Sequence, residues 1–297
     1  MSDHVEQLKA LPKNADFFIG IDSDGCAFDS MEIKQKECFT PNVIEHWGLQ
    51  PVARYAREAC EFVNLYSRQR GVNRFIALVS DLDLIAERPE VHRRNFTPPN
   101  IDPLRKWIAE ETRLGNPTLE KAVAETGDPL LTRALTWSQS VNATVERICK
   151  NVPPFAFVRE SIEKIGDRAD AVVVSATPFE ALDREWREHD LEQYVEMICG
   201  QEMGSKTEHL KYAACGKYDQ DKILMIGDAP GDMKAAKANG VLFYAINPGH
   251  EEESWRRFHD EALDKFFAGQ YAGDYEQKVI DEFLAHLPEL PPWKQQA

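Results

Sequence analysis

The chain has 297 residues, of which 43% are hydrophobic and 29% charged, and its formal net charge at pH 7 is −15. A chain of this length and apolar content can build one large or two modest cores without disulfides or a structural metal. The acidic balance excludes most nucleic-acid binders and proteins drawn to anionic membranes, because both classes need excess positive charge.

No segment of the sequence is typical of export or of membrane insertion. The first residues lack the apolar stretch of a secretory signal, and no run of about 18 apolar residues occurs anywhere. None of the six cysteines forms a Cys-x-x-Cys pair, which argues against a zinc site or a redox pair. These features predict a cytoplasmic protein.

The first predicted element is a buried strand at residues 17–21, an apolar run that stops at Asp22. From residue 31 to residue 151 the pattern changes to helical periodicity punctuated by proline and glycine, with no convincing strand. This block is close to neutral, whereas the remainder of the chain carries nearly all of the negative charge. The sequence therefore predicts an all-helical insert after the first strand of another domain.

Beyond the insert, short apolar runs alternate with helical patterns. The clearest strands are predicted at residues 171–174, stopped by Ser175, and at 223–226, stopped by Gly227 and Asp228. Weaker strands are predicted at 197–199 and 241–246, and helices at about 155–165, 179–189, 205–215, 230–239, 251–268 and 274–286, before a Pro-rich tail at 288–292. Strands that alternate with helices predict a doubly wound, parallel α/β sheet.

Polar residues follow each of the three clear strands. The residues in question are Asp22 and Asp24 after the first strand, Ser175 after the second, and Asp228 and Asp232 after the third. Because ligands of a parallel sheet bind at the carboxyl ends of its strands, we expect these side chains to meet there. Lys206, at the start of the predicted 205–215 helix, would join them.

These residue types are suited to phosphoryl transfer. Two carboxylates about 4 Å apart repel by roughly 4 kcal/mol at an effective dielectric of about 20, so several in one crevice need a cation. Magnesium binds hard oxygen ligands of this kind, and a lysine can hold phosphate or a carboxylate. One carboxylate can attack phosphorus, and a second can protonate the leaving oxygen and later deprotonate water.

Four segments together resemble the motifs of the haloacid dehalogenase superfamily, most of whose members are phosphatases with an inserted cap domain. In chain order, the four segments are residues 22–30, 172–178, 200–206 and 227–232. The resemblance implies a Rossmann-like core over residues 1–30 and 152–297. It also implies that residues 31–151 form a helical cap of the kind called type one.

The resemblance gives three of the aspartates a role in catalysis or metal binding. Asp22 would be the nucleophile, and Asp24 would act as the general acid and base. Asp22, the backbone carbonyl of Asp24 and Asp228 would bind Mg²⁺. Taken alone, each of these residues could also be a turn residue after a strand.

Four further residues would surround the transferring phosphoryl group. The resemblance implies that Ser175, the backbone of Ala176 and Lys206 bind phosphate oxygens, while Asp232 holds Lys206 or a metal-bound water. Ser175 and Asp232 could also cap the helices that follow them, a role compatible with phosphate binding in the case of Ser175.

The expected activity is magnesium-dependent hydrolysis of a small phosphomonoester through an aspartyl-phosphate. A phosphotransferase or phosphomutase would use the same intermediate, and the core sequence does not separate these activities. A carbon–halogen hydrolase would not need Asp24, and Lys34 and Lys36 lie too near the first motif to match the cap lysine of a phosphonate hydrolase. A non-catalytic phosphate-binding module would usually lack a nucleophile or metal ligand, and none is missing. The substrate and the oligomeric state stay open.

The insert also contains a group of arginines. Arg70 and Arg74, beside the Gly71 turn, are the candidates for binding the non-phosphoryl part of an anionic substrate. The alternative is that the arginines form a solvated helix face. The six tryptophans are interpreted as helix-packing residues.

Overall fold

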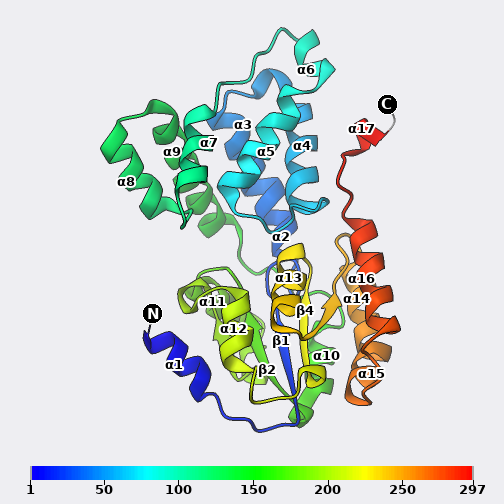
Figure 1. The fold of residues 1–297 in the computed structure, drawn as a ribbon. Coiled ribbons are helices and arrows are strands. Elements are labelled where there is room, and N and C mark those ends of the chain that lie inside the picture. Colours follow the sequence, from blue (N-terminus) through cyan, green and yellow to red (C-terminus); the bar gives the residue numbers. More distant parts are fainter. Residues whose placement is uncertain (1, 296–297) are drawn as a thin grey trace. The chain divides into compact units, whose positions relative to one another are not determined.

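The computed structural model describes residues 2–295, which divide into two compact units (Figure 1). The first unit comprises residues 2–31 and 151–287, and the second comprises residues 32–150 and 288–295. The sequence predicts the segment from residue 288 onward as part of the α/β domain, but this segment groups with the helical unit. The second unit is therefore built from two separate stretches of the chain.

The first unit is built on a five-stranded sheet in which all strands run parallel. The strands are β1 (Phe17–Ile21), β2 (Ala169–Val174), β3 (Met197–Cys199), β4 (Ile223–Gly227) and β5 (Leu242–Ala245). Their order is β3-β2-β1-β4-β5, which confirms the predicted doubly wound α/β fold. The central strands are buried along almost their whole length, as expected for a sheet covered on both faces.

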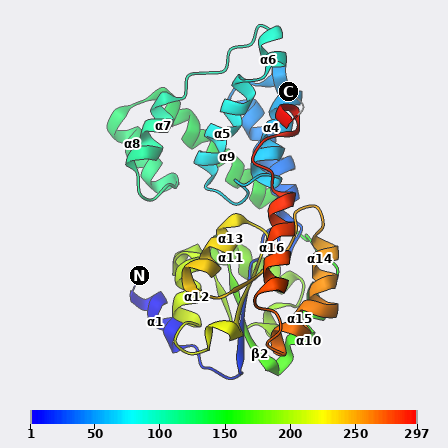
Figure 2. The same ribbon diagram turned by 45° about the vertical axis from the view of Figure 1, so that its right-hand side comes forward.

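Helices flank this sheet on both sides (Figure 1, Figure 2). They are α1 (Ser2–Ala10), α10 (Val158–Ile165), α11 (Phe179–Glu188), α12 (Lys206–Ala213), α13 (Pro230–Asn239), α14 (Glu251–Arg257), α15 (Leu263–Phe267) and α16 (Asp274–His286). α12 and α13 pack side by side on one face, and α10 packs with the π-helical turn Phe258–Ala262 on the opposite side. This turn interrupts the single helix that the sequence predicts over residues 251–268.

The second unit is all-helical over its described residues. The chain enters this unit through α2 (Ser30–Ile33) and the π-helical turn Lys34–Phe39. The helices that follow are α3 (Thr40–His46), α4 (Ala53–Leu65), α5 (Arg74–Ala86), α6 (Pro89–Arg93), α7 (Asp102–Glu110), α8 (Asn116–Thr126) and α9 (Pro129–Ile148). Asp128 starts α9 by accepting hydrogen bonds from the backbone N–H groups of Leu130 and Leu131, at 2.7 and 3.1 Å. A separate apolar core around Phe75 and Trp137 stabilises this unit.

Residues 288–295 attach to the second unit through α17 (Pro292–Gln295). The Arg88 guanidinium lies over the Trp293 ring, 4.2 Å from its centroid, and the Phe62 ring meets the same ring edge-on at 6.0 Å. Lys294 forms an ion pair with Glu87. Arg88 is only 5% exposed, so the segment covers a side chain that belongs to the interior of the unit.

Across residues 2–295, none of the helices is long and apolar enough to cross a bilayer.

Candidate active site

The candidate site lies where the winding of the sheet changes direction. β1 pairs with β2 on one side and with β4 on the other, and an α/β sheet binds ligands beyond the carboxyl ends of strands at such a point. Asp22 follows β1 and Asp228 follows β4. The Asp22 backbone N–H donates to the Ile226 carbonyl at 3.0 Å, so the sheet ladder extends as far as the predicted nucleophile.

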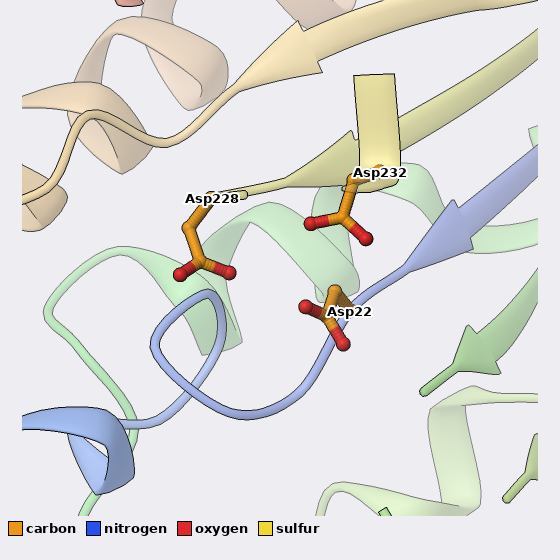
Figure 3. A group of neighbouring side chains, drawn as sticks. All are labelled: Asp22, Asp228 and Asp232. Carbon is orange, nitrogen blue, oxygen red and sulfur yellow. The ribbon is translucent and has the colours of Figure 1, made fainter. Parts of the chain in front are cut away.

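Three buried carboxylates converge at this edge of the sheet (Figure 3). Asp22, Asp228 and Asp232 are 4%, 1% and 0% exposed, and their ligand oxygens lie within 4.8 Å of one another. Asp232 reaches the group from the first turn of α13 because it passes directly over Gly227, where a Cβ atom would lie 2.3 Å from the Asp232 Cβ. Glycine is therefore required at residue 227 for this arrangement.

Lys206 is the basic side chain that contacts this group. Its Nζ lies 2.7 Å from Asp22 Oδ2 and 2.5 Å from Asp232 Oδ1. Burial raises the pKa of Asp22 well above its ordinary value, and the nearby Asp232 and Asp228 raise it further while Lys206 opposes the shift. Burial alone would lower the pKa of Lys206, but the Asp22 and Asp232 carboxylates outweigh it and raise that pKa. The two carboxylates therefore favour the charged form of the lysine.

Asp232 is engaged through both of its carboxylate oxygens. Oδ1 faces Lys206, and Oδ2 accepts a hydrogen bond from the backbone N–H of Ala229 at 3.0 Å. Through Oδ1, Asp232 contacts the ammonium group that also contacts Asp22.

Asp24 is held between two hydroxyl groups that the sequence did not single out. Thr177 donates to Asp24 Oδ2 at 2.7 Å, and the Ser30 hydroxyl donates to Oδ1. A signal for Thr177 was available, because it lies two residues beyond Ser175 in the predicted phosphate-binding turn. Both contacts fix the direction in which the Asp24 carboxyl group points.

Ser175 and Ala176 directly follow the carboxyl end of β2. The Ser175 backbone N–H donates to the Cys199 carbonyl at 3.0 Å, and its hydroxyl accepts from the Thr177 backbone N–H at 3.3 Å. Ser175 is buried and Ala176 is exposed at the start of the turn that leads into α11.

Two tryptophans form hydrogen bonds with the loop after Asp22, although the sequence predicts only a packing role for them. The Trp186 indole N–H donates to the Ser23 hydroxyl at 3.0 Å, and the Trp255 indole N–H donates to the Cys26 carbonyl at 2.7 Å. No local sequence pattern predicts these contacts, because the two donors lie on α11 and α14, far from the loop along the chain.

The two predicted substrate arginines lie within the second unit. Arg70 is 3% exposed and donates to the Leu65 carbonyl at 3.0 Å. Arg74 donates to the Ser138 hydroxyl at 3.0 Å and to the Asn142 side chain at 2.7 Å, and burial lowers the pKa of Arg74 to about 10.

The family model described as haloacid dehalogenase-like hydrolase matches residues 102–246. The match contains Ser175, Lys206, Asp228 and Asp232, and it starts beyond Asp22 and Asp24, which the fold brings to the same site. No curated protein matches the chain.

Several solved structures are similar to this chain at low identity. A haloacid dehalogenase-like family hydrolase from Streptococcus pneumoniae is 11% identical, with a TM-score of 0.43 over 82% of this chain and 91% of the other. A hydrolase of the same superfamily, subfamily IA, from Geobacter sulfurreducens is 17% identical, with a TM-score of 0.40 over 80% and 89%. A predicted phosphatase from Clostridium acetobutylicum is 12% identical, with a TM-score of 0.43 over 90% and 99%.

Proposed function

Because the chain belongs to the haloacid dehalogenase-like hydrolases, a class of enzymes, we propose that it hydrolyses a small phosphomonoester in a magnesium-dependent reaction through an aspartyl-phosphate. The observation that carries this proposal is the contact of one lysine with a buried cluster of three carboxylates. Such a cluster is costly unless further positive charge binds to it.

The donor set of the cluster fits magnesium. Mg²⁺ binds hard oxygen ligands and keeps several waters, so it needs only a few carboxylates close together. Asp22 and Asp228 would hold it together with the backbone carbonyl of Asp24, as the resemblance implies. When bound, the ion would supply charge that neutralises phosphoryl oxygens and the carboxylates themselves.

The residues of this chain suit a two-step hydrolysis. In the first step, an Asp22 oxygen bonds to phosphorus while the bond from phosphorus to the leaving oxygen breaks and Asp24 protonates that oxygen. In the second step, Asp24 takes a proton from water, the water oxygen bonds to phosphorus, and the Asp22 carboxylate is released. Lys206, the Ser175 hydroxyl and the Ala176 N–H would hold the phosphoryl oxygens in both steps.

The contacts of Asp24 favour phosphoester chemistry over a carbon–halogen hydrolase. Its two oxygens accept from Thr177 and Ser30, so the carboxyl group is set in one orientation, as a proton-transfer group must be. Phosphoryl transfer to a second hydroxyl compound would use the same residues and differs only in the acceptor. Recognition of the substrate by Arg70 and Arg74, and a cytoplasmic location, stay predictions.

A panel of phosphomonoesters, assayed for phosphate release with and without Mg²⁺, tests the proposal. We expect release from at least one small ester, loss of that release in EDTA, and recovery when Mg²⁺ is restored. The same panel with added sugar hydroxyl acceptors would identify a phosphotransferase by a phosphorylated acceptor. No release and no transfer from any ester at millimolar Mg²⁺ would contradict the proposed function.

A further inference from the structure

We propose that Glu185 and Trp186 of α11 position the nucleophilic carboxylate of Asp22 by acting through Ser23, an inference that rests on the function proposed above. Ser23 lies between the two predicted catalytic aspartates and is completely buried. Its backbone N–H donates to the Asp22 side chain, and its hydroxyl group forms hydrogen bonds with two residues of α11.

The Ser23 hydroxyl makes two hydrogen bonds whose directions are defined. It accepts from the Trp186 indole N–H at 3.0 Å and donates to Glu185 Oε2 at 3.0 Å. An indole nitrogen can only donate and an ionised carboxylate can only accept, so the hydroxyl proton must point toward Glu185. The side chain of Ser23 is thereby fixed in one rotamer.

The backbone of the same residue controls the orientation of Asp22. The Ser23 N–H donates to Asp22 Oδ1 at 2.8 Å, while Asp22 Oδ2 lies 2.7 Å from Lys206 Nζ. The two oxygens of the carboxylate therefore have different partners, and rotation of the group would break both contacts. A nucleophile held this way presents the same oxygen to phosphorus in every encounter.

Simple packing does not account for these contacts. The Trp186 ring packs edge-on against Phe28 at 5.7 Å, a contact that a phenylalanine at residue 186 would keep. A serine in a fully buried position is costly unless its hydroxyl is paired, whereas an alanine would need no partner. What the indole N–H and the Glu185 carboxylate add is a fixed position for the residue beside the nucleophile.

The network also connects two parts of the site. α11 starts at Phe179, four residues after Ser175, so one helix leads out of the phosphate-binding turn and holds the loop that follows the nucleophile. A shift of α11 would move Ser23 and the phosphate-binding turn together. Glu185 and Trp186 touch neither substrate nor metal in this scheme and are positioning residues.

Kinetic analysis of Trp186→Phe, Ser23→Ala and the double variant tests the inference. We expect kcat for a small ester to fall by about 10- to 100-fold in each single variant, because a displacement of about 1 Å in a reacting group has effects of this size. KM should change by less than about threefold, since the phosphoryl-binding residues are untouched. The double variant should be no slower than the slower single variant, because both changes remove the same hydrogen bond.

Two further variants separate positioning from damage to the fold. Glu185→Gln keeps an acceptor for the Ser23 hydroxyl and should retain more activity than Glu185→Ala. Trp107→Phe is the matched control, because Trp107 is a buried tryptophan of α7 whose indole nitrogen has no hydrogen-bond partner among residues 2–295. Wild-type kcat in Trp186→Phe and Ser23→Ala, or an equal loss in Trp107→Phe, would overturn the inference.

Hydrogen exchange gives a readout that does not depend on activity. Trp186→Phe should speed the exchange of the Ser23 amide with water, and Ser23→Ala should speed the exchange of the Trp186 indole N–H, both followed by NMR. If the wild-type protein releases no phosphate from any ester, the proposed function fails, yet faster exchange would still support the positioning network. Unchanged exchange in both variants would overturn the network even in an active phosphatase.

Discussion

Asp22 in the first unit and Asp81 in the second are both buried carboxylates, but their neighbours differ. In the first unit, Asp22 lies 2.7 Å from the ammonium group of Lys206 and close to two further carboxylates. In the second unit, Asp81 is 3% exposed and accepts hydrogen bonds from the Asn64 amide at 3.3 Å, with no ion pair among the described residues. Burial raises the pKa of Asp81 to about 7, so this group is partly protonated near neutral pH.

The difference separates a reactive site from an interior polar network. Burial also raises the pKa of Asp22, but there the ammonium group of Lys206 opposes the shift and favours the charged form that nucleophilic attack requires. A carboxyl group paired only with neutral donors becomes neutral by binding a proton, and a neutral acid is a poor nucleophile. Four measurements test this distinction.

The largest effect is expected for Asp22→Asn. The amide keeps the shape of the side chain but carries no charge that could attack phosphorus, so turnover should fall to background. Phosphate release is the measurement, and Asp81→Asn is the matched control, because it makes the same change at a buried aspartate outside the site. Activity near that of the wild type in Asp22→Asn would remove this residue as the nucleophile.

A smaller loss, with a different signature, is expected for Asp24→Asn. Without this acid and base, water is not activated, while an ester with a good leaving group can still phosphorylate Asp22. With p-nitrophenyl phosphate the variant should accumulate phosphoenzyme, seen as a mass increase on the peptide that contains Asp22. Slow turnover without any adduct at any quench time would argue against this division of roles.

Magnesium should stabilise the first unit through the same carboxylates. The folded site binds the ion and the unfolded chain does not, so a concentration a hundred times the Kd adds about 2.7 kcal/mol to the free energy of unfolding. Thermal melting with and without Mg²⁺ measures this gain. Asp228→Asn should reduce it, and equal shifts in both proteins would place the ion elsewhere.

The pH dependence of stability should report on Asp81. Its pKa rises from an ordinary value near 3.8 to about 7 on folding, so the folded state binds a proton more tightly and stability falls as pH rises between these values. From pH 5 to pH 8 this group should lower the free energy of unfolding by about 2.5 kcal/mol. Asp81→Asn should lose less stability over that range, measured by urea unfolding; parallel pH profiles would contradict the assignment.

The sequence was most informative where structure is local. The apolar run at residues 17–21 became β1 with the same bounds, because a short apolar run that ends at a polar residue is a local signal of a buried strand. β2 starts at Ala169, two residues earlier than predicted, because Asp170 is buried within it. That carboxylate accepts from the backbone N–H groups of Asn14 and Ala15, and no local pattern reveals such partners.

In the candidate site, too, local sequence patterns revealed some residues, and others depend on contacts with distant parts of the chain. Asp22, Asp24, Asp228 and Lys206 could be selected from motifs that lie directly after strands or at a helix start. Ser23 could not be interpreted from its position, because its partner Trp186 is 163 residues away and belongs to a helix with an ordinary amphipathic pattern. The direction of a side chain into a distant contact depends on tertiary packing, which periodicity does not encode.

The attachment of residues 288–295 to the helical unit matters for any exchange of that unit between relatives. Transplanting residues 32–150 alone would leave the guanidinium of Arg88 without the Trp293 ring that covers it, and Glu87 without Lys294. A chimera would therefore need both stretches of sequence, and recombination at a single pair of junctions would separate groups that fold together. The helical unit is thus a discontinuous module, and a change of either Arg88 or Trp293 should weaken the attachment of residues 288–295.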